Sequence, residues 1–244
     1  MKQIVCMKWG TLYPAHYVNK LYSMVARHIT PPFRFVCMTN ESEGIRPEVE
    51  CLPCPTVPVP PPHNNRGWRK VSLWNDSLPG MEGDWLYLDL DVVVTGTLDG
   101  FFEYEPQSGY IVMQNWTQPG KGIGNTSVFR FRVGSHPYLL HELIAHHDTL
   151  IPRYRNSQTY ISRTVKSMTF WPDDWCILFK THCLPPMPQR WWKAPFLPST
   201  ARVVAFPGVP NPDEAMVGHW PSPWYKKIYK HILPAAWISD YWRE

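Results

Sequence analysis

Two carboxylates stand inside the most apolar stretch of this sequence. Asp89 and Asp91 interrupt residues 84–94, where most other positions are Leu, Val, Trp or Tyr. We expect this stretch to form one β-strand in the middle of a mainly parallel sheet, because an apolar run without alternation is typical of strands buried on both faces. In a strand, side chains two positions apart share a face, about 7 Å apart along the backbone. The sequence therefore predicts two acids that face the same way beside a hydrophobic core.

An acid pair in such a place needs a counter-charge. Like charges held close together beside apolar neighbours raise each other's pKa and weaken the fold unless a cation lies between them. Carboxylate oxygens suit Mg²⁺ or Mn²⁺, and such an ion keeps coordination positions open for the phosphates of a substrate. Asp89 and Asp91 are therefore candidate metal ligands. The alternative is that one of them caps a loop or pairs with an arginine.

The composition bounds the class of protein. A chain of 244 residues can bury one sizeable core, and we expect a single compact unit. The net charge of +4 is small and the Lys and Arg residues are scattered, so nucleic acid is not an expected partner. The N-terminal residues lack the apolar core of a secretory signal, and no stretch is apolar enough to span a bilayer. We therefore expect a cytoplasmic protein.

The elements that would position the acid pair alternate between strand and helix patterns, as in a doubly wound α/β fold. The proline-rich stretch 52–63 is predicted to be an extended surface connection instead. Strands are predicted at 4–7, 33–38, 84–94, 110–115, 127–131 and 202–206, and helices at 14–28, 65–78, 135–147 and 156–165.

Several weak motifs follow one another in an order that is more specific than any one of them. They are Lys70 with Trp74, residues 86–91, Leu98-Asp99, residues 125–129 and residues 203–212. Together, over about residues 3–220, they resemble the retaining glycosyltransferases of the glycogenin and lipopolysaccharide-galactosyltransferase type, glycosyltransferase family 8. The resemblance implies a GT-A fold, an α/β architecture with a Rossmann-like, mainly parallel central sheet flanked by helices. Residues 1–220 would form the catalytic domain, and residues 221–244 an aromatic-rich extension packed on it.

The resemblance also implies an activity and its cofactors. Members transfer a sugar from a nucleoside-diphosphate sugar, usually a UDP-sugar, to an acceptor with retention of configuration, and they use Mn²⁺ bound to the acid pair. Here Asp91 would bind Mn²⁺ (or Mg²⁺), and Asp89 would bind the metal or the donor, with Leu90 between them. The acceptor is not identified, and a saccharide or a lipid-linked sugar would suit the family.

Further site residues follow from the same resemblance. Lys8, Gly10 and Thr11 would lie under the base and ribose, at the carboxyl end of the sheet. The expected contacts to the donor's sugar and phosphates are made by Lys70, Asn125, Thr126 and Gln158, of which Lys70, Asn125 and Gln158 are the predicted catalytic residues.

Two departures from the family pattern matter. Ser157 stands where the family often has an aspartate before the glutamine, so no carboxylate nucleophile is evident and we expect substitution on the face of the leaving group. The family's C-terminal signature also supplies a histidine as a third metal ligand, but the positions here are Ala205, Phe206 and Pro207. His219 is the nearest substitute, and its alternative is a loop histidine stacked on Trp220.

Other interpretations remain open. Ser157 and the missing C-terminal histidine are compatible with a catalytically inactive module that binds a nucleotide-sugar or a metal. The tryptophans at 191–192 and 220–224 are predicted to pack the C-terminal part, with a platform for a sugar acceptor as the alternative. A third possibility is peripheral membrane contact through the aromatic and lysine residues of 224–230.

Overall fold

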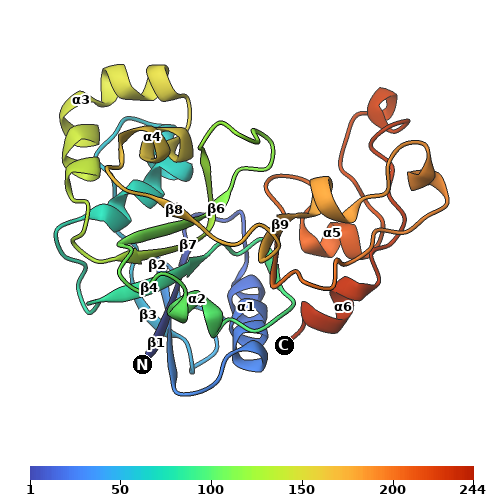
Figure 1. Cartoon of the computed structure of the whole chain (residues 1–244), viewed down its shortest axis with the longest axis horizontal. Helices are drawn as coiled ribbons and strands as arrows, with labels where there is room; N and C mark the ends of the chain where they lie inside the picture. The colour runs from blue at the N-terminus through green and yellow to red at the C-terminus, as the bar shows by residue number, and fades with distance from the viewer.

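A seven-stranded mixed sheet forms the centre of the molecule, and the computed structural model describes residues 1–244 (Figure 1). The strand order is β3-β2-β1-β4-β7-β6-β8; β1 to β4 run parallel, β7 is antiparallel to both of its neighbours, and β8 is parallel to β6. The strands are β1 (Lys2–Lys8), β2 (Phe33–Thr39), β3 (Glu50–Pro53), β4 (Asp84–Leu88), β6 (Tyr110–Gln114), β7 (Gly124–Arg132) and β8 (Thr169–Phe170). The predicted α/β fold class is confirmed.

Both faces of the sheet are covered, because successive side chains of the central strands enter different cores. Ile4 and Cys6 of β1 pack with helix α1 (Ala15–His28). Val5 and Met7 pack instead with the 3₁₀-helix η2 (Gly67–Trp74) and with the α-helices α3 (Tyr138–Tyr154) and α4 (Ser157–Thr164). Burial on both faces explains why the sequence of β1 is apolar without alternation.

A second, three-stranded sheet begins the C-terminal part of the molecule. Its order is β5-β10-β9, with β5 (Val92–Val94), β9 (Cys176–Leu178) and β10 (Val203–Ala205). The remaining short elements are η1 (His63–Asn65), α2 (Gly100–Glu103), η3 (Phe179–Cys183), η4 (Gln189–Trp191), α5 (Pro212–Met216), η5 (Trp224–Lys226) and α6 (Trp237–Tyr241).

The region predicted as an extension, residues 221–244, contacts the main core. Ile238 and Trp242 are buried in the same cluster as α1, and the Trp242 ring lies 5.1 Å from the Tyr17 ring, edge to face. Residues 175–244 form the orange and red lobe at one side of the sheet (Figure 1). No helix of the structure is of a length and hydrophobicity that would let it cross a membrane.

The tryptophans of the C-terminal part differ in burial. Trp220 is 8% exposed, whereas Trp224 is 85% exposed and Trp192 is 61% exposed. The prediction that these tryptophans pack the C-terminal part therefore holds for Trp220 and is wrong for Trp192 and Trp224.

The single strand predicted for residues 84–94 is wrong. The chain leaves the large sheet after Leu88, turns at residues 89–91 and joins the small sheet as β5. Both halves are buried, so an apolar run could not reveal the break between them. The helix predicted for 65–78 is the shorter 3₁₀-helix η2, and the connection predicted from residue 52 contains the end of the edge strand β3.

A buried arginine holds α2 against the sheet. Arg130 on β7 is 2% exposed, and its guanidinium donates to the carbonyls of Phe101 (2.7 Å), Tyr104 (2.9 Å) and Glu105 (2.6 Å). No carboxylate pairs with it, and besides these three carbonyls the guanidinium faces the ring of Trp171, whose centre lies 5.8 Å from Cζ. Arg130 therefore ties the segment that follows β5 to the centre of the fold.

The Arg130→Gln variant should lose about 3–5 kcal/mol of its free energy of unfolding, because buried carbonyls are left without a charged donor. Urea unfolding followed by circular dichroism measures the loss. Arg132→Gln is the matched control: this neighbour is exposed and pairs with Asp84 at 3.0 Å, so its replacement should cost less than about 1 kcal/mol. Similar losses for both variants would contradict the assigned role of Arg130.

Candidate active site

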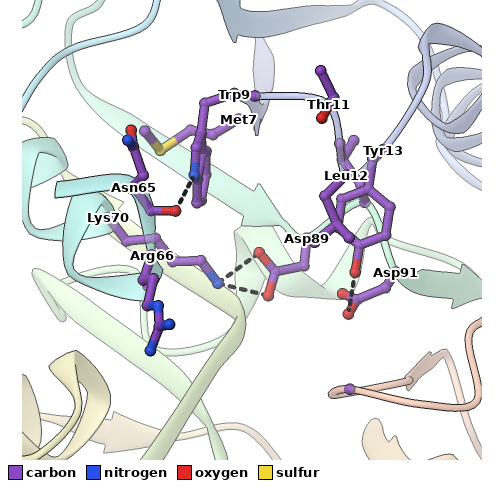
Figure 2. A pocket seen from close by; sticks show the side chains of 14 residues that line it. Met7, Trp9, Thr11, Leu12, Tyr13, Asn65, Arg66, Lys70, Asp89 and Asp91 are labelled. Carbon is purple, nitrogen blue, oxygen red and sulfur yellow. Dashed lines mark hydrogen bonds and ion pairs between the residues drawn. The ribbon is translucent and has the colours of Figure 1, made fainter. Parts of the chain in front are cut away.

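A pocket of about 700 Å³ opens where β1 and β4 end (Figure 2). We call it the larger pocket. Open α/β sheets bind ligands at this carboxyl edge. Its walls come from the turn after β1, from η1 and η2, from the turn after β4, and from the loop after β10. The lining residues are Met7, Trp9–Tyr13, Asn65–Gly67, Lys70, Asp89–Asp91 and Gly208.

A second pocket of about 300 Å³ shares Asp89, Asp91, Lys70 and Gly67 with the larger one. It continues toward β7 and the start of α4, and no hydrophobic residue lines it. We call it the polar pocket. Its other lining residues are Asn115, Thr117, Asn125–Ser127, Asn156–Gln158 and Pro207. The acid pair therefore lies at the junction of a long cleft with two differently lined halves.

Backbone hydrogen bonds on both sides position the two acids. The Asp89 N–H donates to the carbonyl of Ser127 on β7 at 2.9 Å, and the Phe206 N–H donates to the carbonyl of Asp91 at 3.0 Å. The turn between them is thus held by the large sheet at one end and by the small sheet at the other. The two side chains line the same cavity, as predicted, although they reach it from a turn and not from one face of a strand.

Asp89 has its own cation. The ammonium of Lys70 lies 2.6 Å from both carboxylate oxygens of Asp89 and also donates to the Thr126 carbonyl at 3.1 Å (Figure 2). The Tyr87 hydroxyl donates a further hydrogen bond to Asp89 at 2.9 Å. A lysine, and not the arginine of the alternative interpretation, balances this acid.

Asp91 has no cation of its own. It is 8% exposed, and its only side-chain partner is the hydroxyl of Tyr13, which donates to it at 3.1 Å. Burial, and then the charge of Asp89, raise the pKa of Asp91 to about 7, although Lys70 and the Tyr13 hydrogen bond act in the opposite direction. A buried carboxylate that has a raised pKa and no paired cation is a candidate functional group, because its ionised form is unfavourable unless a ligand binds to it.

These residues fit a hard divalent cation that is bound together with a phosphate ligand. Mg²⁺ and Mn²⁺ are commonly held by one or two carboxylates, with phosphate and water completing the shell. The Asp91 carboxylate supplies an uncompensated negative charge, and Asp89 lies beside it in the same cavity. No group of three or more His, Cys, Asp or Glu side chains is close enough to form a metal cage from protein alone.

The structure brings most of the predicted site residues together. Gly10, Thr11 and Leu90 line the larger pocket, and Lys70 lines both pockets. Asn125, Thr126 and Gln158 line the polar pocket, together with Ser157.

Two predicted residues lie elsewhere. Lys8 is not among the residues that line the larger pocket, and its ammonium pairs with Glu41 at 3.2 Å. Lys8 lines a neighbouring hollow that shares Gly10, Thr11 and Tyr13 with the larger pocket. His219 is exposed and lines neither pocket, and its N–H donates to the Glu214 carbonyl at 2.8 Å. The structure does not bring it to the acid pair.

Sequence reasoning missed several lining residues. Trp9 presents its ring to the larger pocket, held by a hydrogen bond from its Nε1 to the Asn65 carbonyl at 3.0 Å, and Arg66 and Tyr13 also line the cavity (Figure 2). The one signal for Trp9 and Tyr13 was their position directly after the first strand. Arg66 comes from a segment that the sequence placed in a regular helix.

Lys180 was missed for a different reason. Its ammonium donates to the carbonyls of Pro207 (2.6 Å) and Val209 (3.2 Å), behind the loop that lines both pockets, and no carboxylate pairs with it. Burial and the charge of Lys230 lower its pKa, whereas the charge of Asp91 raises it. A contact across 27 positions of chain leaves no local pattern in the sequence.

Solved structures share this fold at very low sequence identity. The galactosyltransferase LgtC, in complex with donor and acceptor sugar analogs, superposes with a TM-score of 0.58 at 12% identity, over 86% of this chain and 88% of that chain. The glycosyltransferase GlyE of Streptococcus pneumoniae TIGR4 gives 0.61 at 13% identity over 87% of this chain. The bifunctional WbbM gives 0.52 at 10% identity over 86% of this chain. This chain spans 56% of the length of the GlyE chain and 46% of the WbbM chain.

The sequence matches no model of a known protein family and no curated protein. The structural likeness therefore establishes the fold, and the GT-A architecture implied by the family resemblance is confirmed.

The raised pKa of Asp91 predicts an unusual dependence of stability on pH. In metal-free buffer the folded chain keeps this proton up to about pH 7, whereas the unfolded chain loses it near its ordinary pKa of 3.8. The folded state thus binds the extra proton inside this window, so this group lowers stability as pH rises through it. Asp91→Asn should therefore be more stable than the parent above pH 7, by on the order of 3 kcal/mol, and the gain should shrink toward pH 4.

Urea unfolding at several pH values in the presence of a chelator measures this gain. Asp173→Asn, at an exposed position that lines neither pocket, is the control and should show no such trend. A gain for Asp91→Asn that is the same at all pH values would contradict the assignment.

Proposed function

We propose that this protein is a metal-dependent glycosyltransferase that moves a sugar from a nucleoside-diphosphate sugar, with a UDP-sugar as the expected donor, to a saccharide or lipid-linked acceptor. The observation that carries the proposal is the buried Asp91 carboxylate, which faces the junction of the two pockets without a paired cation. The shared fold with solved glycosyltransferases supports it.

The chemistry requires positive charge where the diphosphate departs. A Mn²⁺ or Mg²⁺ ion held by Asp89 and Asp91 would supply most of it, by polarising phosphate oxygens as negative charge develops on them. The chain adds cations of its own. Lys70 is fixed against Asp89 at the junction, and Lys180 lies behind the Pro207–Val209 loop within electrostatic reach of Asp91. Both ammonium groups are held in place before the reaction, so neither needs to reorient as the bond between the sugar and the diphosphate breaks.

The larger pocket suits the nucleoside. Trp9 offers a flat ring on which a base can stack, and the tripeptide Gly10-Thr11-Leu12 brings backbone close to the cavity. Gly10 adopts a φ of +63°, a left-handed conformation that glycine tolerates, and nothing lies within 4 Å of the position its Cβ would take. Arg66 lines the same pocket and would favour the anionic end of the donor.

The polar pocket suits the sugar of the donor. The side-chain oxygen of Asn125 accepts a hydrogen bond from the Ser127 N–H at 2.9 Å, and that of Asn115 accepts one from the Thr117 hydroxyl at 2.7 Å. Fixing each oxygen in this way leaves the amide NH₂ groups to donate to sugar hydroxyls. Gln158, at the first turn of α4, adds a third amide to the same wall.

Apart from Asp89 and Asp91, no carboxylate lines either pocket. Ser157 stands where the family has an aspartate. Its hydroxyl donates a hydrogen bond to the Gly67 carbonyl at 2.9 Å and so joins α4 to η2. Without a nucleophile, we infer that the acceptor attacks from the face of the leaving group, with a phosphate oxygen as the base and Gln158 as a polar contact to the sugar. Retention of configuration follows.

The anomeric configuration of the product tests this inference. Proton NMR of a reaction with an α-linked UDP-sugar should show an α-linked product from its first appearance. A β-linked product would exclude substitution on the same face.

Donor and metal binding can be tested without knowing the acceptor. A saturating UDP-sugar with Mn²⁺, at about 100 times the dissociation constant, should raise the melting temperature by roughly 5–10 °C. Asp91→Asn should lose the part of this shift that depends on the metal, whereas the control Asp173→Asn should keep it. The proposal fails if no nucleoside-diphosphate sugar shifts the parent protein, or if Asp91→Asn responds as the parent does.

A second candidate, a module that binds donor and metal without turnover, is favoured by one observation: the hydrogen bond that engages Ser157 where the family has an acid. Calorimetry and activity measurements separate the two functions. Binding of the donor with no hydrolysis and no transfer over a panel of acceptors would favour the module.

A further inference from the structure

One loop forms a wall of both pockets. It consists of Phe206–Asn211, between β10 and α5, and we call it the wall loop. Gly208 lines the larger pocket and Pro207 lines the polar pocket. Because the wall loop borders the cleft where the two pockets meet, the contacts that hold it in place affect whatever binds at the acid pair.

The first half of the wall loop is held from two sides. The Phe206 N–H is bonded to the carbonyl of Asp91, and the ammonium of Lys180 is bonded to the carbonyls of Pro207 and Val209. The second half has no such contact and continues into α5. Its position therefore depends on what holds that helix.

A tyrosine of α1 fastens α5. The Asn211 N–H donates to the Glu214 carboxylate at 2.7 Å, so the end of the wall loop is fixed to the helix itself. The hydroxyl of Tyr17 then donates to Asp213, in the first turn of α5, at 2.8 Å and across 196 positions of chain. This hydrogen bond, which we call the latch, is the only one that joins α5 to the helices and strands of the large sheet.

Both partners of the latch are suited to it. Tyr17 is 4% exposed, and burial, and then the hydrogen bond to Asp213, raise its pKa, so the hydroxyl keeps its proton and donates throughout the neutral range of pH. No Lys, Arg or His side chain pairs with Asp213, and Tyr17 is its only side-chain hydrogen-bond partner. The carboxylate is therefore free of competing cations.

The same tyrosine supports the acid pair. The centre of its ring lies 4.9 Å from that of Tyr13, whose hydroxyl donates to Asp91 at 3.1 Å. Neither Tyr17 nor Asp213 lines either pocket. Any effect of this pair on a bound donor must therefore pass through other groups, which are the ring of Tyr13 and the wall loop.

We propose that Tyr17 and Asp213 are positioning residues of the donor site, and that the latch holds the wall loop and Tyr13 in the arrangement that binds the diphosphate with its metal. Without the latch, α5 and the wall loop spend part of the time away from the site, and the apparent affinity falls with the fraction that remains in place. A hydrogen bond to a carboxylate shifts such an equilibrium by about tenfold. The role in donor binding rests on the proposed function, whereas the hold on the wall loop does not.

Amide hydrogen exchange of the full chain, without any ligand, tests the hold on the wall loop. In Tyr17→Phe, which keeps the ring and removes only the hydroxyl, peptides from residues 206–219 should exchange about tenfold faster than in the parent. Asp213→Ala should have the same effect. Peptides from β1 and β4 should keep the exchange rates of the parent, which reports correct folding.

Calorimetric titration with UDP in the presence of Mn²⁺ tests the role in donor binding. Tyr17→Phe and Asp213→Ala should each raise the dissociation constant about tenfold. The double variant should raise it no further, because both changes remove the same hydrogen bond. Asp213→Asn should bind UDP nearly as well as the parent, because its amide oxygen still accepts from the Tyr17 hydroxyl.

Tyr22→Phe is the matched control. Tyr22 lies on the same helix, its ring packs against Phe33 and Phe35, and its hydroxyl makes no hydrogen bond. Removing this hydroxyl should therefore change neither the exchange of residues 206–219 nor the affinity for UDP.

Three results would overturn the proposal. They are unchanged exchange of residues 206–219 in Tyr17→Phe, unchanged UDP affinity in both single variants, and a double variant whose loss is the product of the two single losses. A parent protein that binds no nucleoside diphosphate would overturn the proposed function and, with it, the role of the latch in donor binding. Hydrogen exchange reports the latch without any ligand, so the two failures are distinguishable.

Discussion

The site depends on one electrostatic constraint: two acids meet in a buried turn that contains a single cation. Lys70 lies against Asp89, and Asp91 keeps only the hydroxyl of Tyr13. The two acids cannot separate, because one end of the turn is hydrogen-bonded to β7 and the other end to the residue after β10. The chain thus holds an unfavourable charge in place, as functional sites do when a ligand is to relieve it. Under the proposed function, a divalent cation carrying a diphosphate provides that relief.

Both sheets contribute to the walls of the two pockets. The large sheet presents the ends of β1, β4 and β7, which form the walls of both pockets, while the small sheet supplies the loop at Pro207–Val209 that completes them. Lys180 braces that loop from the C-terminal lobe.

Much of this arrangement could be predicted from local sequence. Apolar runs and helix periods located β1, α1, β2, β6 and β7, and the order of motifs brought Asp89, Asp91, Lys70 and Asn125 to one site. What failed depended on contacts that are distant in the chain. An apolar run could not show that residues 84–94 leave the large sheet and join the small one. Nor could it show that Trp9, the residue after β1, lines the larger pocket. Lys180 and the exposure of Trp224 were likewise decided by loop packing.

The central claim, that the acid pair holds a metal only together with a diphosphate, is tested most directly by electron paramagnetic resonance of Mn²⁺. The signal of free Mn²⁺ should fall little when protein alone is added, and should fall stoichiometrically when protein and UDP are added together, beyond the effect of UDP without protein. Asp91→Asn should remove that additional loss of signal. Full retention of the free Mn²⁺ signal with parent protein and UDP, or an unchanged response in Asp91→Asn, would contradict the account.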